Sequence, residues 1–198
     1  MQAEAIFRSA IRLHQEGLKI KPKIMIPLIA DKKELDFVKS YLNEHIQCLF
    51  NEYEQKPFPY EIDTMIELPR ACLTADKLAQ EADFFSFGTN DLTQMTYGFS
   101  RDDIGKFIGH YKKKDILSSD PFQNIDKDGV GELMRIAVSK ARQVKPNLSI
   151  GICGEVGGDP TSISFFQDIE VTYVSCSSYR VPAARLAVAQ AVLQEERS

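Results

Sequence analysis

The stretch with the most obvious chemical potential is residues 84–98, FFSFGTNDLTQMTYG. It opens with an apolar run that is typical of a strand buried on both faces. The sequence GTND follows, so a glycine, a hydroxyl, an amide and a carboxylate stand where that strand ends. Gly88 lets the backbone approach a ligand closely, and Asp91 offers oxygen ligands to a hard cation such as magnesium. The structural alternative is a strand that runs into a helix capped by an aspartate.

Two further reactive side chains stand at the ends of predicted strands. Glu67 closes the second predicted strand, and Cys153 closes the fourth. The carboxyl ends of parallel strands lie on one rim, so we expect Glu67, Asp91 and Cys153 to converge. Two carboxylates there suit magnesium, which usually takes one or two protein carboxylates and completes its shell with water and substrate oxygens. Alternatively, Glu67 forms an ion pair with the nearby Arg70.

The four cysteines indicate a candidate site residue and the redox environment of the protein. Cys153 lies between Gly151 and Gly154, in a backbone that allows a ligand to approach. A free cysteine is also a small hydrophobic residue that is often buried, and we assign Cys176 to the core on that basis. The four cysteines have no CxxC or Cys/His metal spacing, so we expect reduced thiols in an intracellular protein.

Composition excludes several classes of protein. The chain has 198 residues, of which 43% are hydrophobic and 26% charged, as in ordinary soluble globular proteins. This length predicts one domain, residues 1–198. A net charge of -4 argues against non-specific nucleic-acid binding. No window approaches about 18 consecutive apolar residues, and charged residues stand where a signal peptide needs an apolar core. We therefore expect no membrane segment and a cytoplasmic protein, with an organelle as the alternative.

Strand-like and helical patterns alternate along the chain. We predict strands at residues 23–29, 60–67, 84–87, 148–153 and 171–176. We predict helices at residues 3–16, 31–54, 74–81, 130–144 and 181–196, and a further helix that opens at Asp159-Pro160. Residues 100–128 have an irregular pattern. Such alternation with buried strands indicates a parallel sheet with right-handed crossovers.

The number of units leaves two architectures open. Five strand–helix units are too few to close an eight-stranded barrel, which takes about 250 residues. No GxGxxG follows the first strand, and no P-loop is present. The sequence therefore predicts an α/β fold that is either a complete five-stranded open sheet or the second part of a parallel (β/α)8 TIM-type barrel. Residues 124–135 resemble a calcium loop, but Arg135 stands where a bidentate glutamate is needed.

Several long motifs, in one order, resemble the carboxy-terminal phosphoenolpyruvate/pyruvate-binding barrel of the pyruvate, phosphate dikinase family. The matching stretches are TMIELPRACLTAD (64–76), FFSFGTNDLTQMTYGFSRDDIGKF (84–107), SSDPF (118–122), GVGEL (129–133), GICGEVGGDP (151–160) and YVSCSSYRVPAARLAVAQA (173–191). Enzyme I of the phosphotransferase system and phosphoenolpyruvate synthase share the barrel and the general form of GTND and CGE. The runs SRDDIGKF and RVPAARLA favour the dikinases.

The resemblance implies a fold and residue roles. The five strands would be the fourth to eighth of the barrel. Glu67 and Asp91 match the family's magnesium ligands, and Cys153 matches its general acid/base at the methyl carbon of pyruvate. The family's substrate-binding positions correspond to Glu67, Ser86, Gly88, Thr89, Asn90 and Asp91. Magnesium would stabilise the enolate of pyruvate, whose oxygen takes the phosphoryl group from a phosphohistidine. The whole enzyme converts ATP, pyruvate and phosphate into AMP, phosphoenolpyruvate and diphosphate.

The chain also departs from the family pattern. Val156 stands where the family commonly has a histidine, and the family's CSPFR appears as CSSYR at residues 176–180. The family's ATP-grasp domain, its swivelling phosphohistidine domain and its first barrel strands are absent. We therefore expect a fragment of a homodimeric enzyme that is inactive in isolation. The remaining alternative is a non-catalytic remnant of the barrel.

Overall fold

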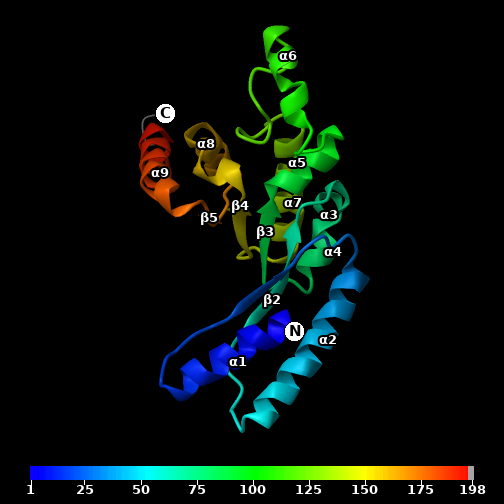
Figure 1. Cartoon of the computed structure of the whole chain (residues 1–198), viewed down its shortest axis with the longest axis vertical. Helices are drawn as coiled ribbons and strands as arrows, with labels where there is room; N and C mark the ends of the chain where they lie inside the picture. The colour runs from blue at the N-terminus through cyan, green and yellow to red at the C-terminus, as the bar shows by residue number, and fades with distance from the viewer. Residues whose placement is uncertain (196–198) are drawn as a thin grey trace.

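The computed structural model describes residues 1–195, and within them five parallel strands form one open sheet (Figure 1). The strands are β1 (Lys23–Ile26), β2 (Glu61–Ile66), β3 (Phe84–Gly88), β4 (Ser149–Cys153) and β5 (Tyr173–Val174). They lie in sequence order, and each pairs in parallel with the next. Each crossover thus moves the chain in one direction, as in consecutive units of a (β/α)8 barrel, whereas a doubly wound sheet reverses at a switch point. The predicted α/β fold is confirmed, with β1 and β5 as open edges.

Helices connect the strands at nearly all the predicted places. The α-helices are α1 (Gln2–Gln15), α2 (Lys32–Glu52), α3 (Pro69–Leu73), α4 (Ala75–Ala79), α5 (Thr89–Tyr97), α6 (Ile108–Lys113), α7 (Val130–Val144), α8 (Pro160–Asp168) and α9 (Val181–Glu195). Short 3-10 helices are η1 (Ile104–Lys106), η2 (Glu155–Gly158) and η3 (Ser178–Arg180). Glu196, which we expected in the last helix, lies outside the described residues.

The edge strands are shorter than the sequence predicts. β1 ends at Ile26 rather than at residue 29, because Pro27 has no N–H to donate and Leu28 turns into the left-handed region, with φ of 57°. β5 covers two residues rather than 171–176, since it pairs only with β4 on one side. A strand with one neighbour has half the ladder bonds that a central strand has.

The prediction of an irregular segment at residues 100–128 is partly wrong. The segment contains η1 and α6, and it projects beyond the carboxyl ends of the strands (Figure 1). Ring packing stabilises it: the ring centroids of Tyr97 and Phe99 are 5.1 Å apart, and Phe99 meets Phe107 at 5.1 Å. A helix of six residues is too short to show a helical period in the sequence, which explains the error.

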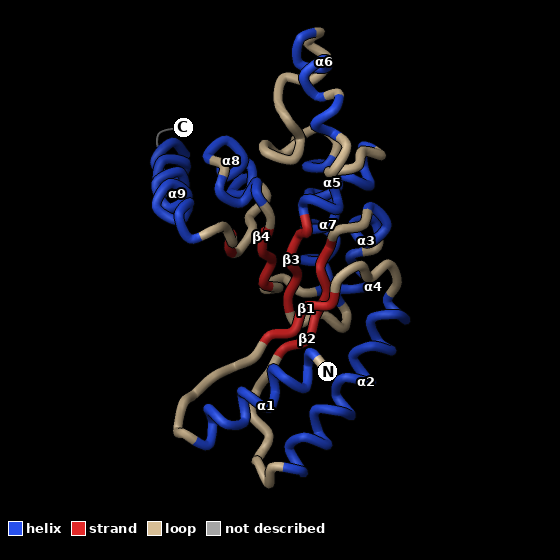
Figure 2. The backbone as a smooth tube through the Cα atoms, in the orientation of Figure 1, coloured by secondary structure: helices blue, strands red, loops and turns tan. Residues whose placement is uncertain are grey.

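Two hydrophobic clusters stabilise the described chain. One joins β2, β3 and β4 to α3, α4, α7 and α8. The other joins α1 and α2 to β2, with Phe7 at its centre. Figure 2 shows α1 and α2 together at the β1–β2 end, and α8 and α9 beside β4. The larger cluster therefore packs around β3 and β4, which are the strands that carry the GTND and CGE motifs. Within residues 1–195, no helix combines the length and apolarity needed to cross a bilayer.

One carboxylate lies inside the sheet. Asp63 in β2 is fully buried and accepts hydrogen bonds from the N–H groups of Thr64, at 2.7 Å, and of Phe84. Burial raises the pKa of Asp63 to about 7, although both N–H bonds and the charge of Lys39 oppose the change. Phe84 is the first residue of β3, so Asp63 ties the start of that strand to β2.

Candidate active site

Glu67 follows directly after β2 and is held by the segment that follows the neighbouring strand β1. Its side chain is buried, and its Oε1 accepts the N–H of Leu28 at 2.7 Å. Leu28 presents that N–H from a left-handed backbone conformation, with φ of 57°, which costs a non-glycine residue on the order of 1–3 kcal/mol. The alternative pairing with Arg70 is wrong, because the Nη2 of Arg70 lies 2.9 Å from Oδ2 of Asp31.

The Glu67 carboxylate also meets that of Asp91, in the first turn of α5. Burial raises the pKa of Glu67, and the charge and hydrogen-bonding contact of Asp91 raise it further, while the Leu28 N–H opposes both effects. Two carboxylates in contact repel each other when both are ionised, so the pair needs either a shared proton or a cation. Residues 1–195 contain no cluster of three or more His, Cys, Asp or Glu side chains that could hold a metal. A two-carboxylate donor set is nonetheless what magnesium takes from proteins.

The carboxyl ends of β3 and β4 bring the remaining predicted residues together. Gly88 is the register partner of Cys153, and the hydroxyl of Thr89 donates to the backbone oxygen of Cys153 at 3.0 Å. Ser86 and Thr89 are buried. The Glu67 carboxylate contacts that of Asp91 and its charge acts on Cys153, so the structure brings the three side chains to one rim, while their roles stay predictions.

Cys153 keeps its proton at neutral pH. Its side chain is half-buried, and Sγ donates to the backbone oxygen of Phe87 at 3.2 Å. Burial raises the pKa of the thiol; a hydrogen bond with Ser86 opposes this, and the negative charge of Glu67 adds to it. A protonated thiol near the Glu67 carboxylate can act as an acid toward a ligand at this rim. Cys72, by contrast, is fully buried in the core.

Asn90 lines a hollow next to this rim. The hollow has a volume of about 470 Å³ and is also lined by Gly154, Glu155, Ser175, Cys176, Ser177, Tyr179 and Arg180. Burial alone would raise the pKa of Glu155, but hydrogen bonding with Asn90 and the nearby Arg101 outweigh it, so the pKa is held below its ordinary value. Cys176, which we assigned to the core, is half-buried: it packs against the core and also borders this hollow.

Three residues near the site were missed in the sequence. Gln94 donates to Asp91 Oδ1 at 2.9 Å, Arg101 binds Glu155, and Glu155 reaches Asn90. Gln94 follows Asp91 by three positions on α5, which puts both on one helix face, so its spacing could have revealed it. Arg101 and Glu155 are 54 positions apart, so no local spacing in the sequence indicates their contact.

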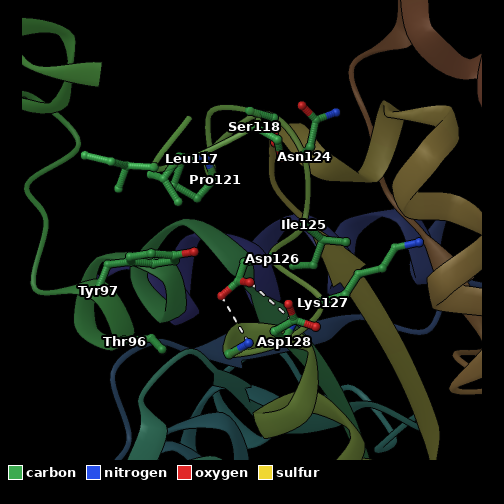
Figure 3. Close-up of a pocket in the computed structure, with 13 residues that line it drawn as sticks. Thr96, Tyr97, Leu117, Ser118, Pro121, Asn124, Ile125, Asp126, Lys127 and Asp128 are labelled. Carbon is green, nitrogen blue, oxygen red and sulfur yellow. Dashed lines mark hydrogen bonds between the residues drawn. The ribbon is translucent and has the colours of Figure 1, made fainter. Parts of the chain in front are cut away.

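A second cavity, of about 590 Å³, lies between the end of α5 and residues 116–129 (Figure 3). Asp126 accepts hydrogen bonds from the N–H groups of Gly129 and Val130, at 3.2 Å and 3.1 Å, and so caps the start of α7. Burial, with the charge of Asp126 next, raises the pKa of Tyr97 to about 12. Asp126 of the rejected calcium loop thus serves a helix start, and none of the predicted site residues lines this cavity.

The two departures from the family pattern have different surroundings. Val156 is buried and belongs to the larger core cluster, so this position packs rather than faces a ligand. Arg180 ends the CSSYR run, and its guanidinium donates to the backbone oxygen of Glu155 at 2.9 Å. The CSSYR turn is therefore tied to η2, which follows β4.

Comparison with known proteins places the chain. Residues 1–193 match the family described as PEP-utilising enzyme, PEP-binding domain. The chain is 54% identical to the pyruvate, phosphate dikinase of Clostridium symbiosum over 197 residues, which are 99% of this chain and 22% of that protein. It is 51% identical to the chloroplastic pyruvate, phosphate dikinase of Mesembryanthemum crystallinum, covering 97% of this chain and 20% of that protein. The chain thus spans about a fifth of the length of the curated relatives it matches.

A solved structure supports the fold alone. The crystal structure of a citrate lyase from Burkholderia xenovorans LB400 superposes with a TM-score of 0.53 at 13% sequence identity, over 84% of this chain and 48% of that chain. Because the family match runs along nearly the whole sequence, the assignment rests on sequence rather than on this likeness. The chain belongs to the PEP-binding domain family of PEP-utilising enzymes.

Proposed function

We propose that this chain carries the site at which pyruvate and phosphoenolpyruvate are interconverted in a pyruvate, phosphate dikinase reaction. The observation that carries the proposal is the meeting of Glu67, Asp91 and the Cys153 thiol at one rim of the sheet. The 54% identity to a pyruvate, phosphate dikinase supports the choice of reaction.

Glu67 and Asp91 would hold a magnesium ion. The two carboxylates already touch, and the raised pKa of Glu67 reflects burial together with the negative charge of Asp91, which a bound cation would offset. Bound there, Mg²⁺ supplies positive charge that stabilises the enolate of pyruvate. Leu28 would keep Glu67 in place through its N–H bond. A chelator that removes Mg²⁺ would remove the stabilisation of the enolate.

The remaining residues bind the substrate and move its proton. Ser86, Gly88, Thr89 and Asn90 border the substrate at the end of β3. When pyruvate is formed, the Cys153 thiol gives its proton to the methylene carbon of the enolate. In the opposite direction, the thiolate takes a proton from the methyl group, and the enolate oxygen accepts the phosphoryl group. We assign the phosphoryl donor, a phosphohistidine charged from ATP, to the other domains of a homodimeric enzyme of this kind.

Magnesium-dependent ligand binding tests this function directly. Oxalate is a planar dianion with the shape of the pyruvate enolate, and calorimetry can measure its binding to the 198-residue chain with and without Mg²⁺. We expect binding only with Mg²⁺, and its loss in Glu67→Gln. Binding of equal strength in EDTA, or in Glu67→Gln, would contradict the proposed function.

A further inference from the structure

Gln94 joins the proposed metal ligand to the projecting segment. Its Nε2 donates to Asp91 Oδ1 at 2.9 Å, and its Oε1 accepts the backbone N–H of Arg101 at 2.8 Å. Both the NH₂ group and the oxygen of the Gln94 carboxamide therefore have a partner. This pairing makes the NH₂ group face Asp91. Gly98, which lies between Gln94 and Arg101 in the chain, ends α5 in a left-handed conformation with φ of 65°. This turn brings Arg101 back toward the helix.

Arg101 continues this line of contacts to the other side of the site. Its guanidinium binds Oε1 of Glu155, the first residue of η2 after β4, and Glu155 lies near enough to Asn90 for Asn90 to lower its pKa. Only the NH₂ group of Asn90 can donate to a carboxylate, and Oε2 of Glu155 is buried without a hydrogen-bond partner among the described residues. The contacts run from Asp91 through Gln94, Arg101 and Glu155 to Asn90, which precedes Asp91 in the chain.

We infer that Gln94, Arg101 and Glu155 are positioning residues that fix the orientation of the Asp91 carboxylate and the Asn90 carboxamide for ligand binding. The inference rests on the proposed function, since it takes Asp91 as a metal ligand and Asn90 as a substrate contact. Oδ1 of Asn90 is buried and has no hydrogen-bond partner among the described residues. A buried acceptor held in that state calls for a donor from water or from a ligand.

The exposure of the ion pair separates this role from a purely stabilising one. The side chains of Arg101 and Glu155 are 47% and 41% exposed, so their attraction adds little to the stability of the fold. Orientation of Asn90, in contrast, depends on the position of a single carboxylate. Substitutions in this set should therefore change ligand affinity much more than they change resistance to unfolding.

Three variants and one control test the inference. Gln94→Leu removes both carboxamide bonds, Glu155→Ala removes the partner of Asn90, and Glu155→Gln keeps an acceptor there. Thr96→Val, on the same helix, removes a hydroxyl that bonds to the backbone oxygen of Leu92 instead. Loss of residues that orient metal ligands typically lowers affinity about 10- to 100-fold. We expect this loss of Mg²⁺-dependent oxalate affinity in Gln94→Leu and Glu155→Ala, partial recovery in Glu155→Gln and no loss in Thr96→Val.

A measurement without ligand completes the test. Nitrogen-15 relaxation of the Asn90 side-chain carboxamide should report a rigid group in the wild type, a mobile one in Glu155→Ala and a rigid one again in Glu155→Gln. Unchanged affinity together with an unchanged Asn90 signal in Gln94→Leu and Glu155→Ala would overturn the inference. If the wild type itself fails to bind oxalate with Mg²⁺, the proposed function fails, and the Asn90 signal still decides whether Glu155 positions this residue.

Discussion

The Glu67 carboxylate packs directly against the backbone of Gly88. A Cβ atom at position 88 would lie 2.4 Å from Glu67 Oε2 and 2.5 Å from the sulfur of Met65. The φ of Gly88 is -87°, which any residue can adopt, so space rather than backbone freedom requires the glycine. Gly88, the first residue of the GTND motif, therefore leaves the space that the Glu67 carboxylate occupies.

Gly88→Ala should weaken both the fold and the site. The added methyl group must displace the buried Glu67 side chain, and overpacking of this kind typically costs about 1–3 kcal/mol of unfolding free energy. Urea unfolding measures that cost, and calorimetry with Mg²⁺ and oxalate measures the expected loss of binding. Gly109→Ala in α6 is the control, because a Cβ there meets nothing within 4 Å. Equal stability and binding in the two variants would show that Glu67 moves freely.

Asp91→Asn should abolish magnesium-dependent binding without harming the fold. Removal of one of two carboxylate ligands should lower oxalate affinity by more than about 100-fold, beyond the usual effect of losing a supporting residue. The charge of Asp91 raises the pKa of Glu67, so its removal relieves a repulsion and should leave the thermal midpoint unchanged or higher. Asp36→Asn on α2, whose carboxylate pairs with Lys32, controls for loss of a surface charge. Retention of affinity in Asp91→Asn would remove Asp91 from the metal site.

The convergence of the site could be predicted because it follows from topology. Once the strands are read as parallel, Glu67, Asp91 and Cys153 must share a rim, whatever the loops between them do. The buried run before Gly88 made that strand unambiguous. The family motifs then restricted the chemistry to one reaction class.

The details that orient the site could not be predicted in the same way. A leucine gives no sign in the sequence that it will take a positive φ, yet Leu28 does so and holds Glu67. The pairing of Arg101 with Glu155 depends on where the projecting segment lies, which only tertiary packing decides. Asp63 reads as one polar residue in an apolar strand, and its burial depends on how β2 and β3 are aligned.

Asp63 should make stability depend on pH. Its pKa is about 7 in the folded chain and about 3.9 in an unfolded one. Between these values the folded state holds the extra proton, so the contribution of Asp63 to the free energy of unfolding falls as pH rises from about 4 to about 7. Lys39 and Asp83 are the charged groups near it, with opposite effects on its pKa.

Comparison with Asp63→Asn isolates this contribution, because Glu67 titrates in both proteins and its effect on stability cancels in the difference. Urea unfolding from pH 4 to 8 should show the wild type losing stability relative to Asp63→Asn as pH rises, with the difference constant above about pH 7. A difference that is the same at every pH would mean that Asp63 is already ionised in the folded state near pH 4. Asp168→Asn, at the end of α8, provides a carboxylate control.

Cys153→Ala should stop proton exchange at the methyl group of pyruvate. In D₂O with Mg²⁺, proton NMR on the full-length enzyme follows the loss of the methyl signal as enolisation replaces protons by deuterons. The thiolate is the form that removes a proton, and burial raises the thiol pKa above its ordinary value of about 8.5. The wild-type rate should therefore still rise with pH beyond about 8.5, and Cys153→Ala should lose this rise. Cys48→Ala, an exposed cysteine on α2, should behave as the wild type. Exchange that persists in Cys153→Ala with an unchanged pH profile would assign the proton transfer to another group.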